Sequence, residues 1–189
     1  MKIKKVLVAN RGEIAIRIFR ACAEIKVKTI GVYTFEDRYS LHRYKADESY
    51  QIGENKEPLK PYLNSDEIIR VALENNADAI HPGYGFLSEN ASFAQKCKEN
   101  GIIFIGPKVA VLKSLGDKIT AKDTMKALGV PCVPGSAGGV DTVEDALKIG
   151  EEFGYPVIIK ATAGGGGKGM KVANSADEMK SAFQTARAE

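Results

Sequence analysis

The chain has 189 residues, of which 44% are hydrophobic, so it can hold one complete domain with a buried core and part of a second. Its formal net charge of +3 is too small to indicate nucleic-acid binding, no apolar run reaches membrane-spanning length, and Met1 lies too close to the first strand pattern for a signal peptide. The three cysteines, Cys22, Cys97 and Cys132, form no C-x-x-C motif, so we expect reduced thiols in a cytoplasmic protein and no metal site in this chain.

The N-terminal residues have the pattern of a strand–helix–strand unit. Residues 5–9 form a buried-strand pattern, residues 13–24 an amphipathic helix, and residues 28–33 a second strand. Glu13 in the first turn of the helix complements the helix dipole. Strands joined by a helix pair in parallel with a right-handed crossover, so the pattern predicts an α/β fold built on a parallel sheet.

Helices and strands alternate along the next segment. We expect a short helix at 39–45, a strand at 49–52, a helix at 66–75 capped by Ser65, a strand at 79–81, a helix at 90–100 and a strand at 102–105. Helices at 109–115 and 118–128 flank a break at Gly116 and Asp117, which we interpret as the domain boundary. We therefore predict an N-terminal α/β domain at 1–115, a connecting helix at 116–131 and a second, partial domain at 132–189.

The loop H-P-G-Y-G-F-L-S-E-N at 81–90 follows a strand end and is a candidate substrate loop. Ligands of open α/β sheets bind outside the carboxyl ends of strands. The loop combines backbone freedom, an aromatic ring and ionisable groups, and its candidate residues are His81, Tyr84, Gly85 and Glu89. The alternative is a rigid turn in which Tyr84 and Phe86 pack as core.

The stretch V-I-I-K-A-T-A-G-G-G-G-K-G-M-K-V at 157–172 predicts a strand, a glycine-rich loop and a second strand. Four consecutive glycines leave bare N–H groups that can wrap an anion. Lys160 and Lys168 place positive charge on both sides of the loop. We expect a flap that closes over nucleotide phosphates, and the alternative is a plain flexible hairpin loop.

Two better-known phosphate loops do not fit this stretch. A P-loop requires Gly-Lys followed by Ser or Thr at the start of a helix, whereas Gly169 is followed by Met170 and a strand pattern. A dinucleotide fingerprint leads directly into a helix, whereas the next helix pattern here begins near Ser175 and runs to Ala186. We therefore reject both of these interpretations.

Four motifs in order resemble the biotin carboxylase subunit or domain of the biotin-dependent carboxylases. They are V-A-N-R-G-E-I-A-I-R-I-F-R-A at 8–21, H-P-G-Y-G-F-L-S-E-N at 81–90, G-D-K at 116–118 and I-I-K-A-T-A-G-G-G-G-K-G-M at 158–170. The resemblance covers the whole chain, and the segment L-H-R-Y-K-A-D-E-S-Y at 41–50 is most similar to pyruvate carboxylases. It implies a pre-ATP-grasp, Rossmann-like N-terminal domain followed by an incomplete α+β ATP-grasp lid.

The resemblance also implies an activity and a set of nucleotide contacts. Family members use magnesium ATP and bicarbonate to form carboxyphosphate and then carboxylate biotin held on a carrier domain. Cations and bare amides stabilise phosphoryl charge, which agrees with the lysines and glycines in this role. The implied ATP-binding residues are Lys118, Lys160, Gly165, Gly166, Gly167 and Met170. The alternatives are a plain surface charge at Lys118 and core packing at Met170.

The first helix carries an implied dimer interface. Arg17, Arg20 and Glu24 share one face through their i, i+3 and i+7 spacing. In the family this face resembles part of a homodimer contact, and the alternative is a solvated charged face. Further implied partners are a biotin carboxyl carrier domain and a carboxyltransferase, with no nucleic acid and no membrane.

The family's magnesium ligands, catalytic base and biotin-handling arginine are expected beyond Glu189, so we expect no catalytic residue in this chain. We interpret the chain as the N-terminal part of a biotin carboxylase that is inactive in isolation. One rival is another ATP-grasp ligase, such as an enzyme of purine synthesis or a carbamoyl phosphate synthetase. A second rival is a non-catalytic chain that only folds or dimerises. The final acyl acceptor, whether pyruvate, acetyl-CoA or propionyl-CoA, stays open.

Overall fold

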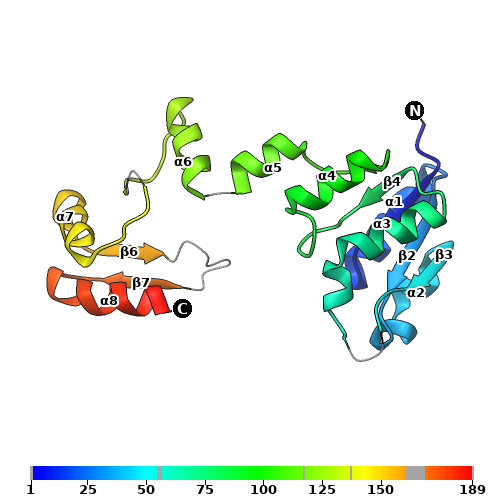
Figure 1. Cartoon of the computed structure of the whole chain (residues 1–189), viewed down its shortest axis with the longest axis horizontal. Helices are drawn as coiled ribbons and strands as arrows, with labels where there is room; N and C mark the ends of the chain where they lie inside the picture. Colours follow the sequence, from blue (N-terminus) through cyan, green and yellow to red (C-terminus); the bar gives the residue numbers. More distant parts are fainter. Residues whose placement is uncertain (1, 55–56, 117, 137, 161–168, 189) are drawn as a thin grey trace. The chain divides into compact units, whose positions relative to one another are not determined.

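The computed structural model describes residues 2–188 except 55–56, 117, 137 and 161–168, and it divides into two compact units, Met1–Gly116 and Asp117–Glu189 (Figure 1). The strands of the first unit are β1 (Lys5–Val8), β2 (Lys28–Tyr33), β3 (Glu48–Gln51), β4 (Ala79–His81) and β5 (Ile103–Phe104). Its helices are α1 (Gly12–Glu24), α2 (Leu41–Lys45), α3 (Ser65–Glu74), α4 (Ala91–Glu99) and α5 (Val109–Gly116), with 3-10 helices η1 (Glu36–Tyr39) and η2 (Lys60–Leu63).

The first unit is a parallel sheet with the strand order β3-β2-β1-β4-β5, which confirms the predicted α/β fold class. The central strand β1 pairs with β2 on one side and with β4 on the other, and Val8 lies opposite both Gly31 and His81. Strands β2 and β3 lie on one side of β1, and β4 and β5 lie on the other. Because β1 and β4 are parallel neighbours, the loops that follow them leave the same edge of the sheet. Such a topological switch point is where open α/β sheets bind ligands.

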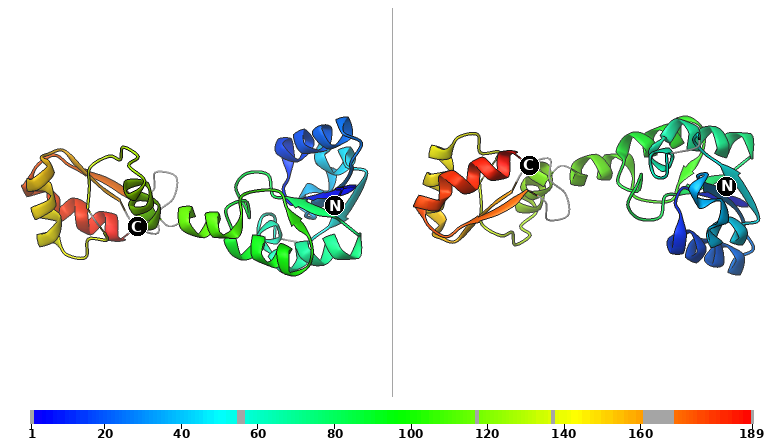
Figure 2. Two further views of the ribbon diagram at one scale, coloured as in Figure 1. Left: turned by 90° about the horizontal axis from the view of Figure 1, so that it is seen from above. Right: turned by 90° about the horizontal axis from the view of Figure 1, so that it is seen from below.

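Helices cover both faces of this sheet, because its strands are apolar on both sides. On one face Val6, Val8 and Ala79 pack against α1 through Ile18 and Phe19. On the other face, the buried residues come from the sheet and from α3 and α4, and they include Leu7, Ile30, Ile80, Ile68, Phe93 and Cys97. Figure 2 shows the blue helix α1 and the blue-green and green helices α3 and α4 on opposite sides of the sheet.

Two details of the first unit differ from expectation. The cap of α3 is Asn64, whose side chain accepts a hydrogen bond from the Glu67 N–H, and not Ser65, whose hydroxyl instead accepts one from the Lys96 ammonium group. Asparagine and serine are both favoured at this position, so the sequence alone could not separate neighbours. The helix expected at 39–45 is instead η1 followed by α2, separated by Ser40 in an extended conformation.

The second unit contains α6 (Lys118–Ala127), α7 (Val143–Phe153), β6 (Val157–Lys160), β7 (Met170–Ala173) and α8 (Ala176–Ala188). Strands β6 and β7 form an antiparallel hairpin, and its inner face packs on α7 and α8 through Val157, Ile159 and Ala173 (Figure 1). Thr142 caps α7 as predicted, because its hydroxyl accepts a hydrogen bond from the Asp145 N–H. Within the described parts of both units, no helix is both long and apolar enough to cross a lipid bilayer.

Candidate functional site

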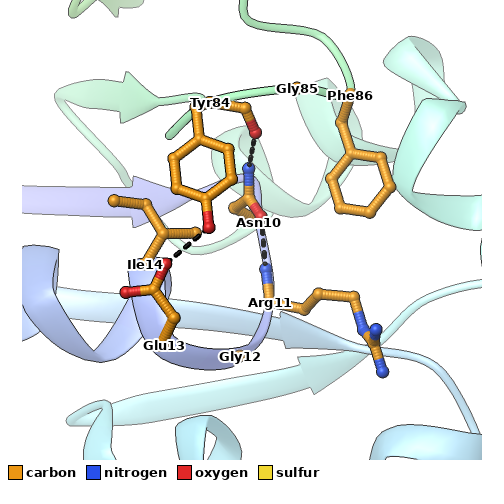
Figure 3. Close-up of a pocket in the computed structure, with 8 residues that line it drawn as sticks. All are labelled: Asn10, Arg11, Gly12, Glu13, Ile14, Tyr84, Gly85 and Phe86. Atoms are coloured by element: carbon orange, nitrogen blue, oxygen red, sulfur yellow. Dashed lines mark hydrogen bonds between the residues drawn. The ribbon is translucent and has the colours of Figure 1, made fainter.

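A pocket of about 340 Å³ lies at the switch point of the first unit. Its wall comes from the loop after β1, with the first turn of α1, and from the loop after β4 (Figure 3). The lining residues are Asn10, Arg11, Gly12, Glu13, Ile14, Tyr84, Gly85 and Phe86. Two segments that are distant in sequence therefore build one concave site at the edge where the parallel sheet favours ligand binding.

Hydrogen bonds join the two loops across this pocket. The Asn10 carboxamide donates to the backbone carbonyls of Pro82 and Tyr84. The Tyr84 hydroxyl donates to Glu13 Oε1, and this hydrogen bond, together with the charge of Glu13, raises the pKa of Tyr84 (Figure 3). Tyr84 is 61% exposed, so its side chain stands at the rim of the pocket and does not pack as core.

The charge of Arg11 is compensated beside the pocket. Its guanidinium forms a two-pronged ion pair with the buried carboxylate of Asp37, which also accepts hydrogen bonds from Tyr62 and Ser40. Burial by itself would raise the pKa of Asp37, but these donors outweigh burial and lower that pKa to about 2. The Tyr62 ring stacks on Phe86 with a centroid separation of 5.2 Å. One buried network therefore supports the outer ends of both loops.

The four predicted loop residues separate into two groups. Tyr84 and Gly85 line the pocket, whereas His81 and Glu89 do not. The half-buried His81 accepts a hydrogen bond from the Gly83 N–H at 3.0 Å through Nδ1, and burial lowers its pKa. Glu89 is exposed at the far end of the loop. His81 thus acts on the loop backbone, and we assign no contact with the pocket to either residue.

Most of the pocket wall was missed at the level of sequence. The segment 10–14 belongs to a motif that supported the resemblance, but no residue of it was assigned to a site. Its position directly after a buried strand was an available signal. What the sequence did not contain was the pairing of β1 with β4, which brings this segment beside the loop after β4.

The second unit contains the two strands, β6 and β7, that border the predicted nucleotide flap. Lys160 and Met170 lie opposite each other as the last paired position of the β6–β7 hairpin. Met170 is 43% exposed, and on the same outer face Ile158 and Val172 are 59% and 52% exposed. Core packing, the alternative considered for Met170, is therefore excluded within this unit. The face combines apolar side chains with the ammonium group of Lys160. This chemistry fits a nucleotide, whose aromatic ring is apolar and whose phosphates are negatively charged.

Several predicted nucleotide contacts cannot be placed. Gly165, Gly166 and Gly167 lie outside the described residues, as does Lys168. Lys118 is the first residue of α6, and its side chain also lies outside the described part. Gly169 is followed by strand β7, so the rejection of a P-loop and of a dinucleotide fingerprint is confirmed.

The three residues of the proposed dimer face are all exposed on α1. Arg17, Arg20 and Glu24 point away from the buried side of the helix, which carries Ile18 and Cys22. No group of three or more His, Cys, Asp or Glu side chains suited to a metal ion occurs in the ranges that the structure describes.

The fold defines a class of protein: a parallel α/β domain with a switch-point pocket, followed by a unit whose antiparallel hairpin borders a glycine-rich segment. Residues 2–112 match the model of the biotin carboxylase N-terminal domain, and residues 117–189 match that of the carbamoyl-phosphate synthase L chain ATP-binding domain. The chain belongs to the biotin carboxylase family, of which it corresponds to the N-terminal and ATP-binding parts.

Curated relatives from the same family match almost the whole chain in sequence. It is 54% identical to the pyruvate carboxylase of Bacillus subtilis over 99% of its length and 53% identical to the biotin carboxylase of Nostoc over 100%. These matches span only 16% and 42% of the two relatives, respectively. The two values are nearly equal although the relatives differ in kind, so overall identity does not choose an acyl acceptor.

Solved structures of biotin carboxylases match the fold of this chain. The dimeric biotin carboxylase domain of Hydrogenobacter thermophilus 2-oxoglutarate carboxylase, in complex with MgADP, ADP and bicarbonate, matches with a TM-score of 0.94 at 48% identity. Biotin carboxylase of Campylobacter jejuni in a β-γ-ATP complex matches with a TM-score of 0.95 at 45% identity. Both comparisons cover 100% of this chain, and 41% and 42% of those chains.

Proposed function

We propose that this chain supplies the N-terminal domain and part of the ATP-grasp lid of an enzyme that carboxylates biotin with MgATP and bicarbonate. In this reaction a bicarbonate oxygen attacks the γ-phosphorus and ADP leaves. The carboxyphosphate formed then gives its carboxyl group to a biotin nitrogen, and phosphate leaves. The proposed boundaries are an N-terminal domain at 1–115, a connecting helix at 116–131 and the lid segment at 132–189.

The observation that carries the proposal is the outer face of the β6–β7 hairpin, in a chain of this family. There an ammonium group, Lys160, lies directly opposite Met170 at the strand ends that flank the glycine-rich segment. We assign the phosphates to Lys160, with Lys118 and the amides of Gly165, Gly166 and Gly167, and the adenine to Met170. A magnesium ion would neutralise phosphate charge, and we assign its ligands and the catalytic base to residues that correspond to the part of the relatives outside the matched region.

We assign biotin to the switch-point pocket, next to Tyr84 and Gly85. The pocket offers an aromatic ring, apolar Ile14 and Phe86, and hydrogen-bonding groups, the combination that suits a small polar ring on an aliphatic chain. We propose the α1 face of Arg17, Arg20 and Glu24 as a homodimer contact. The proposed partners are a biotin carboxyl carrier domain and a carboxyltransferase. The free cysteines of the described chain support a cytoplasmic location.

A substrate screen on the complete enzyme tests this proposal. Phosphate release from ATP is measured with bicarbonate plus free biotin, and in parallel with amine and carboxylic acid acceptors. We expect release that requires both bicarbonate and biotin. Release that instead requires an amine or an acid acceptor would indicate another ATP-grasp ligase, and no ATP use with any acceptor would indicate a non-catalytic role.

A further inference from the structure

The buried Asn10 side chain makes three hydrogen bonds at the switch point. It is 3% exposed, and its Nδ2 donates to the carbonyl of Pro82 at 2.7 Å and to that of Tyr84 at 2.8 Å. Its Oδ1 accepts a hydrogen bond from the Arg11 N–H at 2.9 Å. Both amide hydrogens and the carbonyl oxygen are engaged, so the group has no free donor for a ligand.

The loop that Asn10 contacts has a backbone conformation that needs outside support. Gly83, Gly85 and Phe86 have φ values of 69°, 64° and 39°, all in the left-handed region. That region is unfavourable for a bulky residue such as Phe86, and such conformations persist where surrounding contacts determine them. The Tyr62–Phe86 stack supports one end of the loop, and Asn10 supports the other.

Gly83 and Asn10 are matched to each other. A Cβ at position 83 would lie 2.6 Å from Asn10 Nδ2, closer than real Cβ atoms approach, and a tight 3.1 Å from Asn10 Cβ. The close approach of the loop backbone therefore requires glycine at 83. The two hydrogen bonds that the Asn10 carboxamide donates to the loop require that approach. Gly101, a left-handed glycine at φ 70°, lacks this constraint, because a Cβ there would meet nothing within 4 Å.

We infer that Asn10 is a positioning residue: it sets the backbone of the loop 82–86 so that the Tyr84 ring stands at the pocket rim beside Glu13. It acts through Tyr84, since its own polar atoms are occupied. The link to biotin rests on the proposed function, whereas the effect on the loop does not. Asparagine is suited to this role because one planar group offers two donors and an acceptor, whereas an ionised aspartate would turn a carboxylate toward two carbonyls.

The test compares the complete enzyme with its Asn10→Asp, Asn10→Ala and Gly83→Ala variants. Gly101→Ala is the matched control for strain in the left-handed backbone region. Thr29→Val is a control for loss of a buried polar group, because Thr29 donates hydrogen bonds to Asp47 and not to the loop. Peptide-level hydrogen exchange reports loop order, and steady-state kinetics report KM for biotin and for ATP separately.

We expect the Asn10 and Gly83 variants to exchange the amides of 83–89 about tenfold faster than the controls, the ratio expected when buried acceptors lose their donor. KM for biotin should rise about tenfold while KM for ATP changes less than about twofold. The Asn10→Asp variant should regain biotin affinity relative to Asn10→Ala as pH falls, because a protonated carboxyl regains one donor.

Unchanged loop exchange in Asn10→Asp and Gly83→Ala, relative to Gly101→Ala, overturns the inference. Faster loop exchange with an unchanged KM for biotin keeps Asn10 as the positioning residue and instead removes the assignment of biotin to this pocket. If Asn10→Ala does not fold, the nearly isosteric Asn10→Asp carries the same test.

Discussion

Lys160 and Met170 face each other across the β6–β7 hairpin as its last paired position, with both side chains on the outer face. Lys171 is the next residue along β7, and strand alternation turns it to the opposite face. Lys160 on β6 and Lys171 on β7 therefore lie on opposite faces of the hairpin, and comparing them allows a sharp test of which face binds the nucleotide.

In the complete enzyme, Lys160→Ala should reduce kcat/KM for ATP by about ten- to a thousandfold, the range for removing a charged contact to a transferring phosphate. Lys171→Ala is the control and should change this value less than about threefold. Lys160→Arg should retain part of the activity, because the charge stays. Steady-state ATP cleavage measures all three, and equal losses at positions 160 and 171 would mean that the hairpin face has been assigned wrongly.

Met170→Ala should raise the Kd for ATP about tenfold, since truncation removes apolar surface that the adenine would bury. Met170→Leu should stay within about threefold of the wild type, because leucine has a similar volume. Nucleotide titration by calorimetry measures both affinities. A lower melting temperature with unchanged affinity would assign Met170 to packing against the rest of the enzyme instead.

The Asp37 network predicts a pH-dependent contribution to stability. The pKa of Asp37 is lowered from 3.8 to about 2 in the folded protein, so its stabilising effect is complete above pH 3.8 and is lost as pH falls toward 2. Asp37→Asn should lower the free energy of unfolding at pH 7 by about 2 kcal/mol. It should also reduce the loss of that free energy as pH falls from 3.8 to about 2, the acid limb of the stability curve. Urea unfolding at several pH values measures this, with Asp66→Asn, on the exposed side of α3, as the control. An unchanged acid limb would contradict the assignment.

The α1 face predicts a charge-sensitive dimer. Arg20→Glu in the complete enzyme should shift the sedimentation equilibrium from dimer toward monomer, because it inverts a charge in the proposed contact. Lys98→Glu on α4 reverses an exposed charge elsewhere on the first unit and should leave the association unchanged. A fully dimeric Arg20→Glu variant would exclude this face as the contact.

Local structure followed from local sequence. Strand β2 and strand β4 were predicted at their observed bounds, and the cap of α7 by Thr142 was predicted correctly, because side-chain periodicity and capping depend on residues a few positions apart. The glycine-rich hairpin, the rejection of a P-loop and the family followed from motif order in the same way. The cap of α3 was misplaced by one residue, because two adjacent residues were equally suited to it.

The sequence by itself determined the fold class, the family and the lysine that borders the glycine-rich segment. Only the tertiary structure decided the composition of the pocket. Asn10 and Tyr84 are 74 positions apart, and their contact exists because β1 and β4 pair in parallel and release their loops at one edge. Strand order depends on which apolar faces bury one another across the whole domain, and neither strand's own residues specify its neighbour. His81 and Glu89 illustrate the same limit: part of the predicted loop does line the pocket, but its turn geometry decided that Tyr84 and Gly85 are the lining residues and that His81 and Glu89 are not.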